Sequence, residues 1–311
     1  MKFLSSILTV SLLASPALAQ QNAQQPQAIL LWPNGNPEPS KLTGPEIDPT
    51  TDNNRMYAGK VTVRIKNVSQ PSITVYPAPA ANNSGAAVLV LPGGGYDHLT
   101  WNLEGTEVCD WLNSIGITGI AVKYRVPERG RFPDNPEDME DAQQAIRITR
   151  ANAADWHIDP NKIGVIGFSA GGHLAALMSH QSTFQSPNIP ATNVPAATID
   201  AKPNFQMLMY PAYLVGQDNK LFPLFTPDAK TPPTIIFIAE NDHTARVETA
   251  LVYYQALKDA KVPAELHIYT QGGHGFGIRP TDLPISHWPA IAETWLHTIH
   301  ILGPPGPIGQ P

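Results

Sequence analysis

The stretch that most constrains this chain is Lys162–Met178, which reads KIGVIGFSAGGHLAALM. The apolar run Ile163–Ile166 is followed at once by Gly-Phe-Ser-Ala-Gly and then by residues that favour a helix. Strand, Gly-x-Ser-x-Gly turn and helix in this order are typical of a nucleophile elbow. Such a turn needs glycine at Gly167 and Gly171, because a Cβ there would collide with the crossing strand or helix. Ser169 is therefore the candidate nucleophile; a chance occurrence of the pattern in a loop is the alternative.

Strand-like and helix-like segments alternate along most of the chain. Ala87–Leu91 is a continuous apolar run typical of a buried parallel strand, and Pro136–Trp156 has the apolar stripe of a helix. This alternation implies right-handed crossovers and an α/β fold with a doubly wound, mainly parallel sheet. Val61–Ile65 and Ser72–Tyr76 alternate with a period of two, which predicts an antiparallel N-terminal hairpin at one edge. Further strands are expected at Ile117–Tyr124, Phe205–Tyr210, Thr234–Ala239 and Leu266–Tyr269, and helices at Asn102–Ile115, Arg246–Ala260 and Ser286–Ile301.

Four parts can be distinguished along the chain. Residues 1–19 have a positive start, an apolar middle and an Ala-Leu-Ala end, which is the pattern of a secretory signal peptide. Residues 20–56 are expected to form an N-terminal extension and loop, 57–302 a single α/β domain, and 303–311 a disordered Pro/Gly tail. We therefore expect a secreted or periplasmic protein without a membrane anchor.

Charge and cysteine content narrow the kinds of partner and cofactor. With 20 Lys and Arg against 26 Asp and Glu, the formal net charge is −6 and no basic cluster is present, so nucleic acid is not an expected partner. Cys109 is the sole cysteine and lies in an apolar helical pattern, which excludes an internal disulfide and a zinc-thiolate site. The sequence has no His-Glu-x-x-His and no nucleotide-binding glycine loop, so no metal, cofactor or obligate protein partner is predicted.

A serine nucleophile requires a base, and ten histidines compete for this role. His274 follows the last expected strand and is flanked by glycines, which allow the backbone to enter a crowded cleft. His243 is the main competitor, because it adjoins the best acid candidate, whereas His173 is expected to pack beneath the sheet. His274 is thus the candidate base.

The acid that holds the base in the right tautomer is expected after the strand Thr234–Ala239. Asp242 lies there, with Glu240 as the alternative carboxylate and a helix N-cap as the alternative role for Asp242. The chain order Ser169, Asp242, His274 is a known order for a nucleophile, acid and base on an α/β sheet.

Backbone amides for an oxyanion hole are expected from two places. The amide of Ala170 lies at a helix N-terminus, and Gly94 and Gly95 follow the strand Ala87–Leu91 in a run of three glycines. Which of the two glycines donates stays open. Three aromatic residues are candidates for a pocket wall or for stacking on a sugar, each equally plausible as part of the core: Tyr96, Trp101 and Tyr210.

Several of these segments together resemble a known family. The run 141–174, Pro92–Tyr96 with Glu104–Gly105, Val262–Gly277 and Leu30–Pro33 resemble exported bacterial α/β-hydrolase-fold esterases of the acetyl xylan esterase or feruloyl esterase-like (BD-FAE-like) group. The chain departs from many lipases and esterases at Pro92, where they carry a histidine before the glycines. The resemblance implies an α/β-hydrolase fold and a serine carboxylesterase acting on acetyl or similar small acyl esters of plant polysaccharides. It also implies that Glu104 braces the oxyanion loop.

Other functions are compatible with the same motifs. A feruloyl or general short-chain carboxylesterase would use the same three residues on another substrate. A peptidase of the prolyl-oligopeptidase type shares the fold, but usually carries a propeller domain, and the chain before Ala86 is too short for one. A non-catalytic binding protein of this fold typically lacks the nucleophile or the base, both of which are present here.

Overall fold

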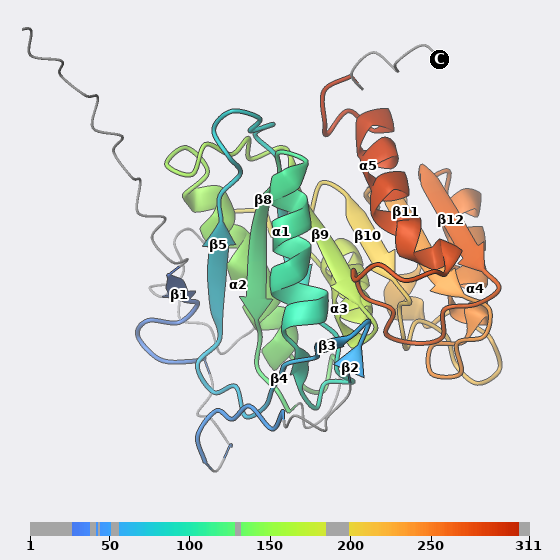
Figure 1. The fold of residues 1–311 in the computed structure, drawn as a ribbon, viewed down its shortest axis with the longest axis horizontal. Helices are drawn as coiled ribbons and strands as arrows, with labels where there is room; N and C mark the ends of the chain where they lie inside the picture. Colours follow the sequence, from blue (N-terminus) through green and yellow to red (C-terminus); the bar gives the residue numbers. More distant parts are fainter. Residues whose placement is uncertain are drawn as a thin grey trace, which may run out of the picture.

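The structure is a computed structural model that describes residues 27–37, 42, 44–50, 56–127, 132–184 and 199–304. The expected signal peptide, residues 20–26, 38–41, 43 and 51–55 of the N-terminal extension, and residues 305–311 lie outside the described residues. An eight-stranded sheet forms the centre of the molecule, in the order β1-β5-β8-β6-β9-β10-β11-β12 (Figure 1). Its strands are β1 Ala28–Leu30, β5 Ser72–Tyr76, β6 Ala87–Leu91, β8 Thr118–Lys123, β9 Ile163–Phe168, β10 Gln206–Met209, β11 Thr234–Ala239 and β12 Ala264–Tyr269.

The sheet is parallel from β8 to β12 and antiparallel at its β1–β5 edge. The central strands β6, β9 and β11 are buried along their whole length. This burial explains why they read as continuous apolar runs, since helices cover both of their faces. The mainly parallel, doubly wound sheet expected from the sequence is confirmed.

In the described part of the chain, five α-helices form the outer layers (Figure 1). On one face lie α1 (Glu107–Ser114) and α5 (Trp288–Thr298), and on the other lie α2 (Glu137–Ala151), α3 (Ala170–His180) and α4 (Val247–Asp259). Shorter helical segments are a π-helix at Asn102–Thr106 and 3₁₀ turns at Pro223–Phe225 and Pro284–His287. Among the described residues, no helix has the length and apolar character needed to cross a membrane.

The sequence predicts that Val61–Ile65 and Ser72–Tyr76 pair as a hairpin, and this pairing is wrong. β5 pairs with β1 and β8, not with the preceding segment. That segment is divided between two small sheets: β3 (Lys60–Val61) pairs with β2 (Met56–Tyr57), and β4 (Arg64–Ile65) pairs with β7 (Leu99–Thr100). The alternation of side chains indicates a half-buried strand but carries no information about which strand lies beside it.

Helix α1 packs closely against strand β8. Cys109 on α1 is fully buried, and a Cβ added to Gly119 on β8 would lie 2.7 Å from its Cβ. Glycine at 119 therefore lets the helix approach the strand. Burial raises the pKa of the Cys109 thiol well above its usual value, as expected for an unreactive core cysteine.

Candidate active site

Ser169 occupies a strained turn between β9 and α3, with φ 53° and ψ −114°. The turn brings backbone segments very close together. A Cβ on Gly167 would lie 2.1 Å from the carbonyl oxygen of Gly171, and a Cβ on Gly171 would lie 2.1 Å from that of Leu91. Only glycine fits at these positions, and the turn raises the Ser169 hydroxyl at the carboxyl end of β9.

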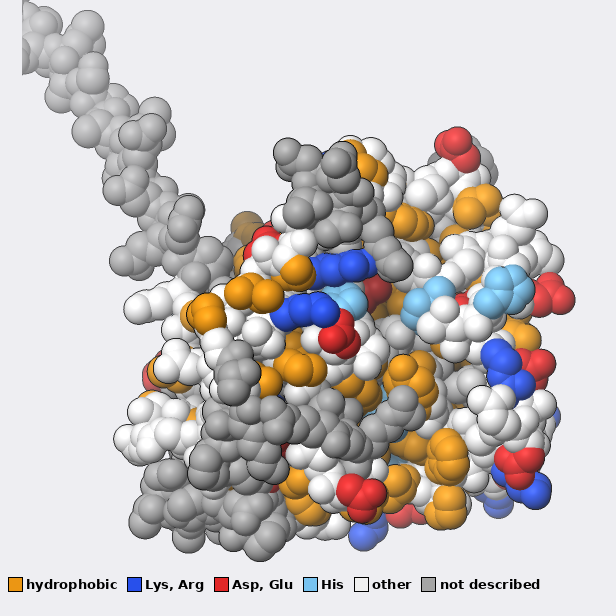
Figure 2. All heavy atoms as spheres, turned by 90° about the horizontal axis from the view of Figure 1, so that it is seen from below, with side chains coloured by type: hydrophobic (Ala, Val, Ile, Leu, Met, Phe, Trp, Pro, Cys, Tyr) orange, Lys and Arg blue, Asp and Glu red, His pale blue; other side chains and the backbone are white. Residues whose placement is uncertain are grey.

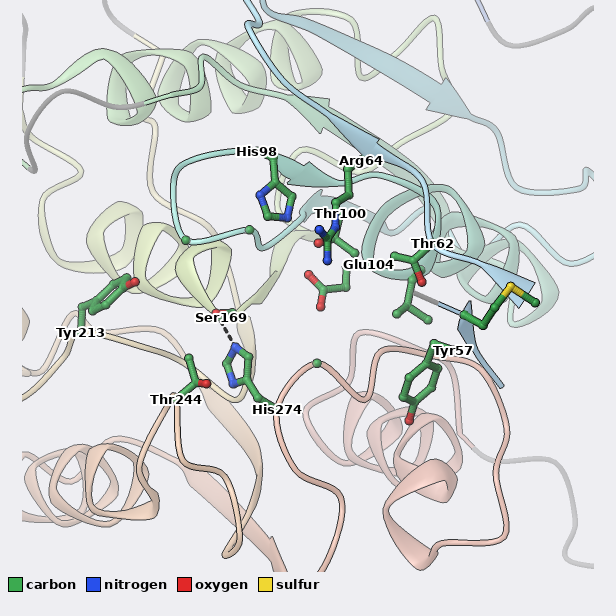
Figure 3. Close-up of a pocket in the computed structure, with 15 residues that line it drawn as sticks. Tyr57, Thr62, Arg64, His98, Thr100, Glu104, Ser169, Tyr213, Thr244 and His274 are labelled. Carbon is green, nitrogen blue, oxygen red and sulfur yellow. Dashed lines mark hydrogen bonds between the residues drawn. The ribbon is translucent and has the colours of Figure 1, made fainter. Parts of the chain in front are cut away.

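The structure brings Ser169, His274 and Asp242 together in a hydrogen-bonded chain. Ser169 Oγ lies 2.8 Å from His274 Nε2 (Figure 3), and His274 Nδ1 lies 2.7 Å from Asp242 Oδ2. The three residues follow β9, β12 and β11, whose carboxyl ends meet at one edge of the sheet. This geometry allows His274 to remove the serine proton while Asp242 holds the ring.

The loop after β11 fixes the Asp242 carboxylate, which is 3% exposed. Its second oxygen, Oδ1, accepts hydrogen bonds from the amides of Thr244 at 2.7 Å and Ala245 at 2.8 Å. It does not cap α4, whose N-cap residue is Arg246. The competing carboxylate and imidazole, Glu240 and His243, are both exposed.

The glycine loop after β6 lies beside the serine. Gly94 and Gly95 have φ values of +135° and +64°, and a Cβ on Gly94 would lie 1.9 Å from the carbonyl oxygen of His98. Both glycines line the same cavity as Ser169. Ala170 is the first residue of α3, so its amide belongs to the end of the helix whose N–H groups have no intrahelical acceptor. Amides from both places can therefore point towards an oxyanion.

Glu104 connects the glycine loop to the rest of the site. It is 4% exposed; its Oε2 accepts a hydrogen bond from the amide of Gly93 at 2.8 Å, and its Oε1 accepts one from the Tyr210 hydroxyl at 2.7 Å. The Tyr210 hydroxyl in turn accepts a bond from the amide of Gly277, on the loop that carries His274. Burial raises the pKa of the Glu104 carboxyl, against the opposing effect of these hydrogen bonds.

Ser169 and His274 open into a cavity of about 420 Å³ (Figure 3). The cavity lies at the carboxyl ends of the parallel strands, since Ser169 and His274 follow β9 and β12. In Figure 1 these strand ends point to the lower side of the molecule. Figure 2 views that face, where charged and histidine side chains are mixed with hydrophobic ones. The lining residues are Met56, Tyr57, Thr62, Arg64, Gly94, Gly95, His98, Thr100, Leu103, Glu104, Ser169, Tyr213, Thr244, His274 and Gly275.

The aromatic residues expected at a pocket wall do not line this cavity. Tyr96 and Tyr210 are buried and Trp101 is half-buried, and none of the three is among the lining residues. Tyr96 Oη lies 2.7 Å from Nδ1 of His173, so its polar end has a partner in the core. The cavity is instead lined by Tyr57 and Tyr213.

Sequence reasoning missed most of the cavity wall. Tyr213 lies shortly after the carboxyl end of β10, and this position is a signal that could have indicated it. Tyr57, Thr62 and Arg64 lie in short segments with no motif, and only the fold brings them to the site. Among the described residues, no group of three or more His, Cys, Asp or Glu side chains is arranged to hold a metal.

Comparison with known proteins places the chain in a family. The BD-FAE family model matches residues 73–257, more than half of the chain. The protein belongs to the BD-FAE family. This BD-FAE protein is 33% identical over 220 residues to an acetylxylan esterase of Xylanibacter ruminicola, an alignment that covers 63% of the chain and 42% of that relative. The chain thus matches less than half the length of that curated relative.

Solved structures share the fold along much greater parts of their length. An acetyl ester-xyloside bifunctional hydrolase from Caldicellulosiruptor lactoaceticus is 29% identical, with a TM-score of 0.67, and the match covers 90% of this chain and 98% of that one. A thermophilic esterase from Thermogutta terrifontis, solved with propionate bound, is 26% identical, with a TM-score of 0.65 and coverage of 78% and 94%. The expected α/β-hydrolase fold and the family resemblance are both confirmed.

Proposed function

We propose that this BD-FAE protein is a serine carboxylesterase that hydrolyses acetyl or similarly small acyl esters of carbohydrates. The observation that carries the proposal is the chain of hydrogen bonds from Ser169 Oγ through His274 to Asp242, open to a cavity at the sheet edge. A serine, an imidazole and a buried carboxylate in this arrangement perform acyl transfer in many unrelated folds.

In the proposed reaction, Ser169 Oγ attacks the acyl carbon while His274 Nε2 takes the serine proton. The carbonyl oxygen becomes an oxyanion, which the amide of Ala170 and an amide of the Gly94–Gly95 segment stabilise. His274 then gives its proton to the departing alcohol oxygen, which leaves an acyl-enzyme. A water molecule repeats the sequence, releasing the acid and restoring the serine. Asp242 accepts the Nδ1–H bond throughout and stabilises the imidazolium without taking its proton.

Small acyl groups and carbohydrate alcohols are supported by the relatives. The names of two of them refer to acetylxylan and to an acetyl ester-xyloside, and the Thermogutta esterase holds propionate. A further relative, 27% identical over 224 residues, is an ethyl acetate hydrolase of Pseudomonas putida. General short-chain carboxylesterase activity is therefore the second candidate. Residues 1–19 support the further proposal that the protein acts in the periplasm or outside the cell.

The first experiment replaces the nucleophile. Ser169→Ala is expected to lower kcat for p-nitrophenyl acetate by about 10⁴-fold or more, because the attacking oxygen is lost while the cavity remains. Ser114→Ala, at an exposed serine on α1, is the matched control and should retain parental activity. A Ser169→Ala protein that is as fast as its parent would contradict the proposal.

Substrate class is tested by the release of acid from three esters: acetylated xylan, methyl ferulate and ethyl acetate. Faster turnover of acetylated xylan than of ethyl acetate supports the carbohydrate esterase. Ethyl acetate hydrolysis without action on acetylated sugars supports the second candidate, and a preference for methyl ferulate would identify a feruloyl esterase.

A further inference from the structure

We propose that the β2–β3 hairpin and β4 form a subsite for the sugar ring that carries the ester, with Tyr57 as its platform and Arg64 as its hydrogen-bond donor. The inference rests on the proposed function and adds to it the part of the site that recognises the alcohol.

The cavity extends to two sides of the Ser169–His274 pair. In Figure 3, Tyr57 and Thr62 lie on one side of this pair, and Tyr213 and Thr244 lie on the other. The side of Tyr57 is built by the small sheets near the N-terminus, since Met56, Tyr57, Thr62 and Arg64 all line the cavity there. An ester held at Ser169 therefore extends one of its two parts along this wall.

The chemistry of this wall suits a sugar. Tyr57 is half-buried and Met56 is 56% exposed, so together they offer an apolar surface for the C–H face of a ring. Burial raises the pKa of the Tyr57 phenol, which stays neutral. A pyranose presents such an apolar face together with a rim of hydroxyl groups, whereas a long acyl chain offers no hydrogen-bonding groups.

Polar side chains line the cavity beside this apolar surface. The guanidinium of Arg64 has five N–H donors, so it can bind a substrate hydroxyl while keeping contacts within the protein. The Thr62 and Thr100 hydroxyls line the same region, and His98 adds an imidazole whose pKa is lowered by burial. A few polar groups that fix orientation beside an apolar wall are typical of small-molecule sites.

The backbone of the β2–β3 hairpin is hydrogen-bonded to Arg279, which is 4% exposed. Its guanidinium donates hydrogen bonds to the carbonyl oxygens of Tyr57 at 3.0 Å, Lys60 at 2.7 Å and Val61 at 3.0 Å. It also binds both oxygens of Glu107 at 2.8 Å. An isolated two-stranded hairpin is only marginally stable, so Arg279 supplies the order that the small sheet lacks. A wall fixed before the substrate arrives lowers the entropic cost of binding.

The wall lies outside the part of the chain that the family model matches, as His274 also does. Residues 56–64 precede residue 73, where the family match begins. The cavity therefore combines a nucleophile from the matched region with a wall from outside it.

The test compares two acetyl esters that differ only in the alcohol: ethyl acetate and an acetylated xylo-oligosaccharide. Tyr57→Ala is expected to lower kcat/KM for the oligosaccharide about tenfold or more, mainly through KM, which corresponds to about 1.4 kcal/mol of binding. It should lower kcat/KM for ethyl acetate much less than for the oligosaccharide, because ethyl acetate has no sugar ring to lie on the platform. Arg64→Leu should show the same selectivity. Tyr57→Phe keeps the ring and should retain oligosaccharide activity.

Two further measurements separate binding from folding. Tyr254→Ala, at a half-buried tyrosine of α4 outside the cavity, is the matched control. It should change kcat/KM for neither ester. Deacetylated xylo-oligosaccharide should inhibit the parent protein competitively. Its inhibition constant should be at least several-fold higher for the Tyr57→Ala variant.

Three other outcomes are possible, and each contradicts either the proposed function or the sugar subsite. A parent protein that cleaves ethyl acetate but no acetylated sugar removes both the carbohydrate substrate and the subsite. A parent that cleaves the oligosaccharide, with Tyr57→Ala unchanged or equally slow on both esters, removes the subsite alone. A changed preference between ethyl acetate and ethyl butyrate would show that the wall holds the acyl group, and would also overturn the inference.

Discussion

Glu104 joins two loops of the active site through one carboxylate. One oxygen binds the glycine loop at Gly93, and the other reaches the His274 loop through the Tyr210 hydroxyl. A Cβ at Gly93 would lie 2.7 Å from Glu104 Oε2, so the contact also requires glycine there. A side chain outside the proposed proton-transfer chain thus links the glycine loop to the loop that carries His274.

Replacing Glu104 by Gln tests this role. Glutamine has one acceptor oxygen, so either the Gly93 amide or the Tyr210 hydroxyl loses its acceptor. We expect the free energy of unfolding to fall by about 1–3 kcal/mol. Activity should decrease about tenfold to hundredfold, through kcat more than KM, because the glycine loop is no longer held against the serine. Denaturant unfolding and steady-state kinetics measure the two effects.

Tyr210→Phe provides the control for Glu104→Gln. Because the two side chains share one hydrogen bond, the double variant should lose less than the sum of the two single losses. Strictly additive losses would show that Glu104 and Tyr210 act separately.

The positions of the proposed reactive residues could be predicted from the sequence better than those of the cavity wall. Ser169, Asp242 and His274 each follow a recognisable strand, and an open α/β sheet brings such positions together. Tyr96, Trp101 and Tyr210 are aromatic residues near the motifs, but the direction of a side chain after a strand depends on the backbone. Tyr210, with φ 38°, and Tyr96, with φ 62°, are both in the left-handed region, which sequence does not reveal.

Among the secondary-structure elements, α3 and α4 meet through an imidazole and a phenol. His180 Nε2 on α3 lies 2.8 Å from the Tyr253 hydroxyl on α4, and its ring also packs against Phe225. Burial lowers the pKa of His180 to about 4, with smaller effects from Lys202, which lowers it, and Asp228, which raises it. The folded protein thus favours the neutral imidazole.

This shift predicts a loss of stability in mild acid. In the unfolded chain the imidazole binds a proton below pH about 6.5, whereas in the folded protein it does so only near pH 4. The stabilisation is therefore complete above pH 6.5 and is lost as pH falls towards 4, at no more than about 1.4 kcal/mol per pH unit. Urea unfolding at several pH values measures the slope. His180→Gln should flatten it, and an unchanged slope would assign it to other groups.

The types of element were predictable, but the partners of the short strands were not. Long apolar strands such as β6 and β11 lie where the sequence indicated, because burial on both faces leaves a strong pattern. Two-residue strands such as β3 and β4 leave almost none, and their pairing is decided by distant segments. β4, for example, pairs with β7, which follows the glycine loop.

For the molecule as a whole, Arg279 connects regions that are far apart in the chain. It binds carbonyl groups of the β2–β3 hairpin more than two hundred residues earlier, and a carboxylate at the start of α1. The pair with Glu107 is shielded, with side-chain exposures of 3% for Arg279 and 27% for Glu107. The β2–β3 hairpin at the cavity is therefore hydrogen-bonded to the segment that follows His274.

Removing this guanidinium should weaken the whole domain. Arg279→Gln is expected to lower the free energy of unfolding by about 3–5 kcal/mol, because the Glu107 carboxylate and several carbonyl groups lose their hydrogen-bond donor. A loss of this size would lower Tm by roughly 10 °C or more for a domain of this length. Lys220→Gln, in an exposed pair with Asp218, is the control and should change Tm by no more than about 1 °C, since exposed pairs contribute little. Equal shifts for the two variants would contradict the role given to Arg279.

The single sulfhydryl of the chain lies between α1 and β8, where Gly119 allows the helix to close completely. A reagent that modifies thiols can reach it only in molecules whose helix has lifted from the sheet. The rate of that modification would therefore report how often α1 separates from the sheet. The measurement needs no substitution, and the reagent would not occupy the cavity at Ser169.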